Sequence, residues 1–175
     1  MKYFILIFTF ILSIISTSNS FSNDKIISKL QSGGNIVFIR HAIAPGNGDP
    51  ENFNIKDCST QRNLSEEGIN QSKKIGDFFK KNNINIAKVL SSEWCRCKDT
   101  AKYAFKNFST FEGLNSFYDP RFEKYKIKQI NDLKRYIKEW ESTDNLILIT
   151  HYVVISEILN KGVSSGEIII TDKNF

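Results

Sequence analysis

Hydrophobic positions along the chain fall into two kinds of pattern. Nearly continuous apolar runs, each as long as a buried strand, occur four times. They are residues 35–39, 86–92, 145–150 and 167–171. Elsewhere apolar residues recur every three or four positions, as on one face of a helix. These stretches are residues 24–32, 96–107, 127–141 and 152–160, together with the segment after Ser65. Because strands and helices alternate, the pattern predicts an α/β domain with a largely parallel central sheet.

The longest segment without either pattern is 41–64, which is rich in Gly, Asn, Asp and Pro. Loops of this length inside a compact domain are usually functional or disordered. The helix after it is expected to begin at Ser65 as N-cap, with Glu66 and Glu67 in the first turn, where the helix dipole favours acidic side chains. We expect residues 44–60 and 108–126 to shape a specificity pocket.

The first twenty residues have the order of a secretory signal peptide. Lys2 is followed by an apolar stretch over residues 3–15 and then by small polar residues. Thirteen apolar-biased residues are short for a membrane span, which needs about 20. We therefore predict a signal peptide over residues 1–20, an exported domain over residues 21–175, a location in the bacterial periplasm, and no stable membrane insertion once the signal is removed. The alternative is an uncleaved N-terminal anchor.

Length and charge limit the remaining classes of function. A chain of 175 residues leaves room for one ordinary domain. The formal net charge is +5, with 24 Lys and Arg against 19 Asp and Glu. The lysines are scattered, and no basic cluster of the kind that binds nucleic acid is present. We therefore expect no nucleic-acid partner.

The three cysteines fit an oxidising compartment, where one disulfide and one spare thiol would be expected. Cys95 and Cys97 are too close in sequence to bridge easily, so Cys58 should pair with one of them. Cys58–Cys95 and Cys58–Cys97 both stay open at this stage. The alternative is three buried free thiols.

Two of the predicted strands lead directly into the only two histidines of the chain, His41 and His151. Arg40 precedes the first of them, and Arg96 follows a third apolar run. Because ligands of open α/β sheets bind outside the carboxyl ends of the strands, these four side chains should meet at one edge. Each alone would more often be a structural histidine or a surface arginine. Together, however, buried cations need an anion to neutralise them, and arginine matches phosphate geometry, so the sequence predicts a phosphate site.

Four segments resemble motifs of the histidine phosphatase superfamily, which has the phosphoglycerate-mutase-like fold. They are Arg40-His41-Ala42, RNLSEEG (62–68), SSEWCRCKDTA (91–101) and ITHYVVI (149–155). They occur in the family's order over most of the domain. The resemblance implies a single-domain three-layer sandwich, with helices on both faces of a mostly parallel sheet. Within the family, the chain resembles small exported members that act on lipopolysaccharide-core heptose phosphates, which share an SGE segment, here residues 165–167.

The resemblance implies that His41 is the nucleophile and forms a phosphohistidine that water hydrolyses. It also implies that Arg40, Arg96 and His151 bind the phosphoryl oxygens, and Arg62 is a further candidate phosphate contact. No metal or cofactor is required. The expected partner is a small phosphorylated substrate or a lipopolysaccharide-type phosphate of the envelope.

The chain departs from the family pattern in two places. Ala42 stands where the family has glycine, and no acid occurs at residues 114–116, where the proton donor of the mutase branch would fall. Asp119 is the first candidate for that donor, and the alternative is that it is an Asp-Pro turn residue. Two further functions therefore remain open: a phosphate-binding or interaction protein that has lost turnover, and a phosphohistidine phosphatase.

Overall fold

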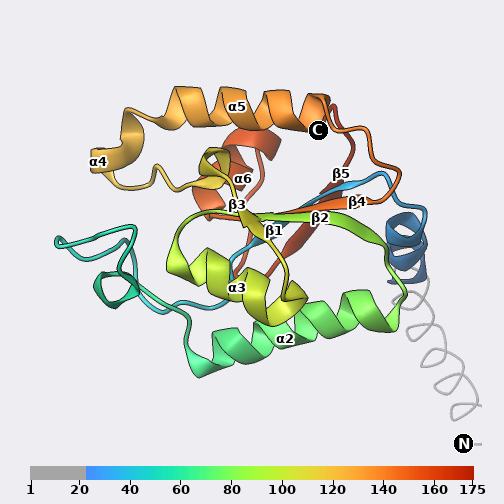
Figure 1. The fold of residues 1–175 in the computed structure, drawn as a ribbon, viewed down its shortest axis with the longest axis horizontal. Coiled ribbons are helices and arrows are strands. Elements are labelled where there is room, and N and C mark those ends of the chain that lie inside the picture. The colour runs from blue at the N-terminus through green and yellow to red at the C-terminus, as the bar shows by residue number, and fades with distance from the viewer. Residues whose placement is uncertain (1–22) are drawn as a thin grey trace, which may run out of the picture.

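The computed structural model describes residues 23–175, and these form a five-stranded sheet between two layers of helices (Figure 1). The strand order is β3-β2-β4-β1-β5. All neighbours pair in parallel except β1 and β5, which are antiparallel. The strands are β1 (Ile36–Arg40), β2 (Ile86–Ser91), β3 (Ser109–Thr110), β4 (Asn145–Thr150) and β5 (Ile168–Thr171).

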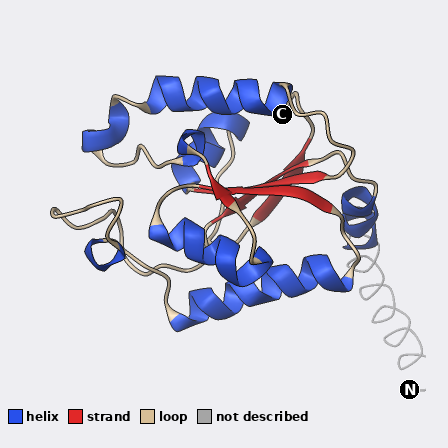
Figure 2. Ribbon diagram, viewed as in Figure 1, coloured by secondary structure: helices blue, strands red, loops and turns tan. Residues whose placement is uncertain are grey.

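The helices cover both faces of the sheet (Figure 2). One face carries α2 (Glu66–Lys81), α3 (Cys95–Phe105) and the helix over 23–31, while the other carries α5 (Lys126–Lys138) and α6 (Tyr152–Leu159). Three short helices lie in the connections: η1 (Cys58–Thr60), η2 (Glu112–Leu114) and α4 (Pro120–Glu123). The predicted α/β architecture with a mostly parallel sheet and helices on both faces is therefore confirmed.

The apolar runs are continuous because both faces of the central strands are covered. Ile36 and Phe38 of β1 pack into the core beneath α5 and α6, while Val37 and Ile39 pack into the core beneath α2 and α3. Alternate residues of a strand point to opposite faces, so a strand covered on both sides must be apolar throughout. Every residue of β4 is buried for the same reason.

Several elements differ from the expectations. The strand β3 was not predicted, because its two residues, Ser109 and Thr110, are polar and exposed. The segment 41–64 contains only the short helix η1. Ser65, the next residue, caps α2 as predicted, since Ser65 Oγ accepts from the Gly68 amide at 3.2 Å. The predicted signal peptide over residues 1–20 lies outside the described residues. Within residues 23–175, no helix has the length and apolar character needed to cross a bilayer.

Candidate active site

The carboxyl ends of β1, β2 and β4 lie side by side and deliver the polar residues to one cavity. Parallel pairing places Arg40 opposite Thr150 and Ser91 opposite Ile149, so the next residue of each strand lies at the same edge. The cavity measures about 140 Å³. Its lining includes all six predicted site residues, namely Arg40, His41, Arg62, Arg96, Asp119 and His151.

His41 is held with one ring nitrogen free. Its Nδ1–H donates to the carbonyl oxygen of Ala42 at 2.8 Å, and because a carbonyl only accepts, the lone pair of the neutral ring is on Nε2. The side chain is 3% exposed. Burial, followed by the positive charge of Arg96, lowers the pKa of His41 to about 3. The ring is therefore neutral near pH 7 and has the electron pair that a nucleophile needs.

The low pKa of His41 predicts a pH dependence of stability. A histidine in the unfolded chain has a pKa near 6.5, so between pH 6.5 and about 3 the unfolded state binds more protons than the folded state. The contribution of His41 to the free energy of unfolding is fully present above pH 6.5 and falls as the pH drops from 6.5 toward 3. Urea unfolding at pH 7 and pH 5 should show that His41→Gln removes about 2 kcal/mol of the wild-type pH dependence. An equal pH dependence in both proteins would contradict the assignment.

Arg96 is buried and paired with an acid that the sequence did not reveal. Its Nη1 and Nη2 donate to the two carboxylate oxygens of Asp49, at 2.8 and 3.2 Å. Trp94 Nε1 donates to the same carboxylate at 3.0 Å, as does the backbone amide of Arg62 at 3.1 Å. Arg96 Nε has no protein partner, which leaves that donor for an anion in the cavity.

Arg40 and Arg62, which both line the cavity, differ in their hydrogen-bond partners. Arg40 Nη1 donates to the Val163 carbonyl at 2.7 Å, and its buried Nε has no protein partner. Arg62 donates through Nε to Gly48 O at 2.9 Å and through Nη1 to Ala44 O. Burial lowers the pKa of both guanidinium groups. Arg62 thus holds the 41–64 segment in place through Nε and Nη1, whereas the buried Nε of Arg40 has no protein partner.

A hydrogen-bonded chain orients His151. Asn115 Nδ2 donates to the Glu93 carboxylate at 2.6 Å, and Asn115 Oδ1 accepts from Ser92 Oγ at 3.1 Å. With its proton directed to Asn115, the Ser92 oxygen accepts from His151 Nε2 at 2.9 Å. His151 Nδ1 has no protein partner, and the rings of His151 and His41 lie edge to face at 5.5 Å. Burial, then Arg96 and His41, lowers the pKa of His151 well below its usual value.

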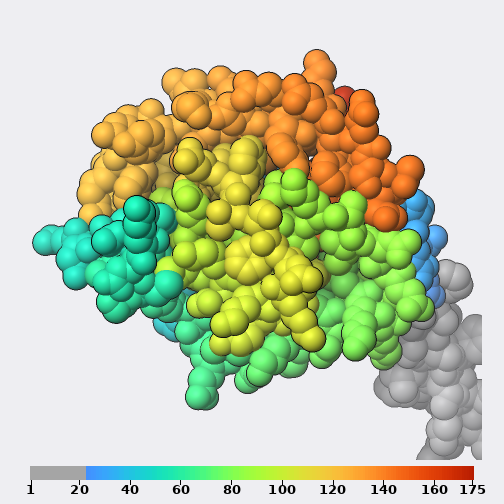
Figure 3. Space-filling view, in the orientation of Figure 1, coloured from blue at the N-terminus to red at the C-terminus, as the bar shows by residue number. Residues whose placement is uncertain are grey.

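Asp119 lies at the rim of the cavity, where its carboxylate accepts hydrogen bonds from Arg121. Its Oδ1 accepts from the Arg121 amide as N-cap of α4, and its two oxygens accept from Arg121 Nε and Nη2 at 3.0 and 2.7 Å. These hydrogen bonds lower the pKa of Asp119. Arg121 also donates to the Glu51 carbonyl at 2.8 Å, so the teal segment 45–60 borders the α4 region at one end of the molecule (Figure 3).

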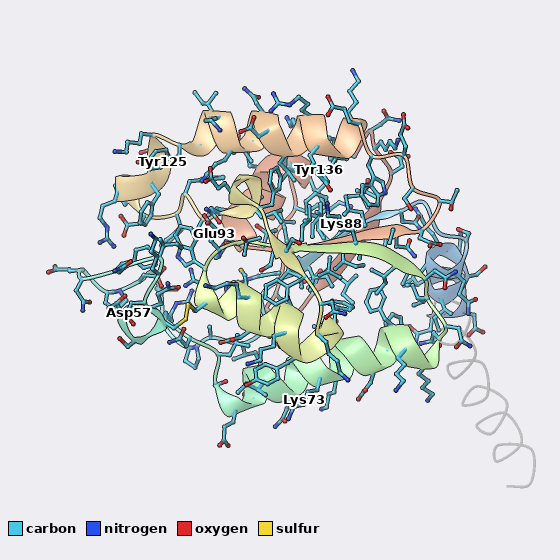
Figure 4. The ribbon with its side chains drawn as sticks, in the orientation of Figure 1. Asp57, Lys73, Lys88, Glu93, Tyr125 and Tyr136 are labelled. Carbon is cyan, nitrogen blue, oxygen red and sulfur yellow. A yellow bond between two sulfur atoms is a disulfide. The ribbon has the colours of Figure 1, made fainter. Side chains whose placement is uncertain are left out.

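A close approach and a disulfide fix the segment 41–64 beside the cavity. A Cβ at Gly68 would clash with the Ile43 carbonyl, so only glycine lets α2 begin against the chain two residues after His41. Cys58 and Cys95 form a disulfide, visible as a yellow bond near Asp57 (Figure 4), while Cys97 is free and buried. The 41–64 segment is thereby tied to the first residue of α3, next to Arg96.

Asp49 and Trp94 are two of the cavity residues that sequence reasoning missed. Asp49 lies in a segment without periodicity, and its partner Arg96 is 47 positions away. The only sequence signal was the excess of arginine and histidine predicted at the site, which requires a balancing anion. The Ser92–Asn115–Glu93 chain was also missed, although Ser92 and Glu93 lie within the quoted segment 91–101.

Comparison with known proteins relates this arrangement to one superfamily. The model of the histidine phosphatase superfamily (branch 1) matches residues 36–147. Searching curated protein sequences gives no significant match. Three solved structures illustrate the likeness, which at these identities shows the fold.

The first is the protein histidine phosphatase SixA complexed with tungstate, with 15% identity, coverage of 79% of this chain and 89% of that chain, and a TM-score of 0.55. The second is a mycobacterial glucosyl-3-phosphoglycerate phosphatase with VO3, with 14% identity, coverage of 78% of this chain and 91% of that chain, and a TM-score of 0.54. The third is a mutant phosphoserine phosphatase from Entamoeba histolytica with phosphoserine, with 16% identity, coverage of 78% of this chain and 89% of that chain, and a TM-score of 0.53.

The family match covers more than half of the chain and extends from β1, which leads into His41, to the middle of β4. The chain belongs to branch 1 of the histidine phosphatase superfamily and is a phosphatase of the histidine phosphatase type.

Proposed function

We propose that the protein is a metal-independent phosphomonoester hydrolase that works through a phosphohistidine on His41. The observation that supports this proposal is the orientation of the His41 ring. Its Nδ1–H donates to the Ala42 carbonyl, while Nε2 stays free in a cavity lined by cations. Nε2 attacks phosphorus, the bond to the leaving oxygen breaks, and water then cleaves the P–N bond. Arg40 and Arg96 bind the phosphoryl oxygens and stabilise their charge in the transition state. The bound anion favours the protonated form of His151, whose Nδ1 has no protein partner and then donates to a phosphoryl oxygen.

For the substrate, we propose a small phosphorylated compound or an envelope glycolipid phosphate, such as the lipopolysaccharide-core heptose phosphates. A cavity of about 140 Å³ is smaller than the ~300 Å³ or more of a typical drug-sized ligand site, so it takes the phosphoryl group and little else. The rest of the substrate would lie against the rim. Tyr118 and Tyr152 there are exposed and offer flat surfaces to a sugar or other ring.

Export of the mature domain, residues 21–175, to the periplasm is part of the proposal. The Cys58–Cys95 disulfide supports it, because such bonds persist in oxidising compartments and are rare in the cytosol. The apolar stretch 3–15 supports it independently.

Metal removal tests the mechanism. Residues 21–175 should hydrolyse an aryl phosphate at an unchanged rate in excess EDTA, because histidine and arginine supply the nucleophile and the charge. The measurement is the initial rate before and after chelation and after added Mg²⁺ or Zn²⁺. A rate that falls tenfold or more with EDTA and returns with metal would contradict the proposal. Vanadate binding without any turnover would instead favour a phosphate-binding protein that has lost hydrolysis.

A further inference from the structure

Both oxygens of the Asp49 carboxylate are occupied by N–H donors. Oδ1 accepts from Arg96 Nη1 at 2.8 Å and from the Arg62 amide at 3.1 Å. Oδ2 accepts from Trp94 Nε1 at 3.0 Å and from Arg96 Nη2 at 3.2 Å. The side chain is 7% exposed. Because Trp94 and the Arg62 amide hold the carboxylate from outside Arg96, its orientation does not depend on the guanidinium that it binds.

This pairing leaves one edge of the Arg96 guanidinium unused. The planar group has five N–H donors, one on Nε and two on each Nη. Nη1 donates to Asp49 and to the Arg62 carbonyl at 3.4 Å, and Nη2 donates once, to Asp49. The buried Nε has no protein partner. The remaining donors are therefore the Nε–H and the second N–H of Nη2, which lie side by side on one edge of the plane.

The unused edge suits a phosphoryl group. Arg96 lines the cavity, and two parallel N–H donors match two oxygens of a phosphate. Donors that are held in place before the reaction stabilise developing charge more effectively than donors that must first be reoriented. Since Asp49 occupies the outer edge formed by the two Nη groups, it determines which edge of Arg96 is presented to substrate.

We propose that Asp49 is a positioning residue for Arg96, an inference that rests on the proposed phosphohistidine function. Asp49 holds the two Nη groups, so that the Nε–H and the second N–H of Nη2 bind two phosphoryl oxygens while His41 Nε2 attacks phosphorus. The Asp49 carboxylate keeps its charge and its four hydrogen bonds throughout the reaction. It transfers no proton and acts only through Arg96.

The test is a double-variant cycle that combines Asp49→Asn with Arg96→Met. Asparagine keeps one oxygen acceptor, but its NH2 group cannot accept from the second Nη, so the paired contact is lost. With 4-nitrophenyl phosphate, kcat should fall about 100-fold, as expected when a catalytic group is displaced by about 1 Å. KM should change less than about threefold, because the cation stays in the cavity. In the Arg96→Met background, Asp49→Asn should cause no further loss of kcat/KM.

Two further variants complete the kinetic test. Asp49→Glu, which keeps both carboxylate oxygens, should recover part of the loss in kcat. Asp57→Asn is the matched control, since Asp57 lies on the same segment but is exposed and caps η1 (Figure 4). It should keep wild-type kcat and KM.

Vanadate binding gives a second measurement that needs no turnover. Vanadate resembles the transition state of phosphoryl transfer, so Asp49→Asn should raise its Kd about tenfold or more where Arg96 is present. In the Arg96→Met background, the same substitution should not raise the Kd. A thermal melt reports whether each variant folds. If Asp49→Asn does not fold, Trp94→Phe takes its place, because it removes one donor to Asp49 and should lower kcat in the same direction by less than about tenfold.

Two outcomes would overturn the assignment. An equal loss with and without the Arg96 guanidinium would show that Asp49 acts independently of it. Faster hydrolysis with tighter vanadate binding in Asp49→Asn would make Asp49 an anion that competes with substrate. Wild-type protein that hydrolyses no phosphate ester would instead overturn the proposed function, and the vanadate cycle would still show whether Asp49 acts through Arg96.

Discussion

Replacing His41 with alanine should lower kcat/KM for aryl phosphate hydrolysis by roughly 10³-fold or more, because His41 is the proposed nucleophile. The ring of His151 lies 5.5 Å away and its Nδ1 also has no protein partner, so a phosphoenzyme that remains in the variant would point to His151. The cations would remain, so the variant should still bind vanadate. Rapid quenching of wild-type protein in base should trap a phosphoenzyme that is stable there and is lost on acidification, and the variant should trap none.

The control for this experiment is a basic side chain outside the cavity, because both histidines of the chain lie in the site. Arg135 is exposed on α5 and pairs only with Asp132. Arg135→Ala should keep wild-type turnover. His41→Ala activity within tenfold of wild type, with a trapped phosphoenzyme, would show that another residue is the nucleophile.

Loss of the Cys58–Cys95 disulfide should destabilise the domain by about 4 kcal/mol and lower Tm by about 10 °C. The bond joins residues 37 positions apart, and the chain-entropy estimate for a loop of that length gives this magnitude. Activity should fall as well, because the tethered segment carries Asp49 to Arg96. The comparison is Cys58→Ala/Cys95→Ala against wild type, by thermal unfolding and by kcat/KM.

Cys97 provides the check on this assignment. It is free and buried, so Cys97→Ser should keep the mass change of two hydrogens on reduction, whereas Cys58→Ala should lose it. A double variant that unfolds within about 1 kcal/mol of wild type would contradict the stabilising role.

The central strands were predictable because two covered faces force an unbroken apolar run, as in β4. The convergence of His41, Arg96 and His151 was predictable for a related reason, since parallel strands share one carboxyl edge. The strand β3 could not be predicted from the sequence, because two exposed polar residues give no periodic hydrophobic signal.

The acids of the site lie beyond what the sequence alone can specify. The sequence identified Asp119 as a loop acid, but its engagement by Arg121 depends on the side-chain geometry at the start of α4. Asp49 was missed because its role depends on how an aperiodic segment folds back onto Arg96. Such long-range polar contacts carry no local pattern.

The place of β1 in the strand order has a consequence for how the chain reaches its native state. The first strand lies between the last two, β4 and β5, and its pairing with β4 joins residues such as Ile36 and Leu146. A growing or emerging chain therefore cannot complete its core until nearly all of it is available, and high contact order of this kind slows folding. The segment that carries the nucleophile stays unpaired until then, so catalytic competence and completion of the fold arrive together.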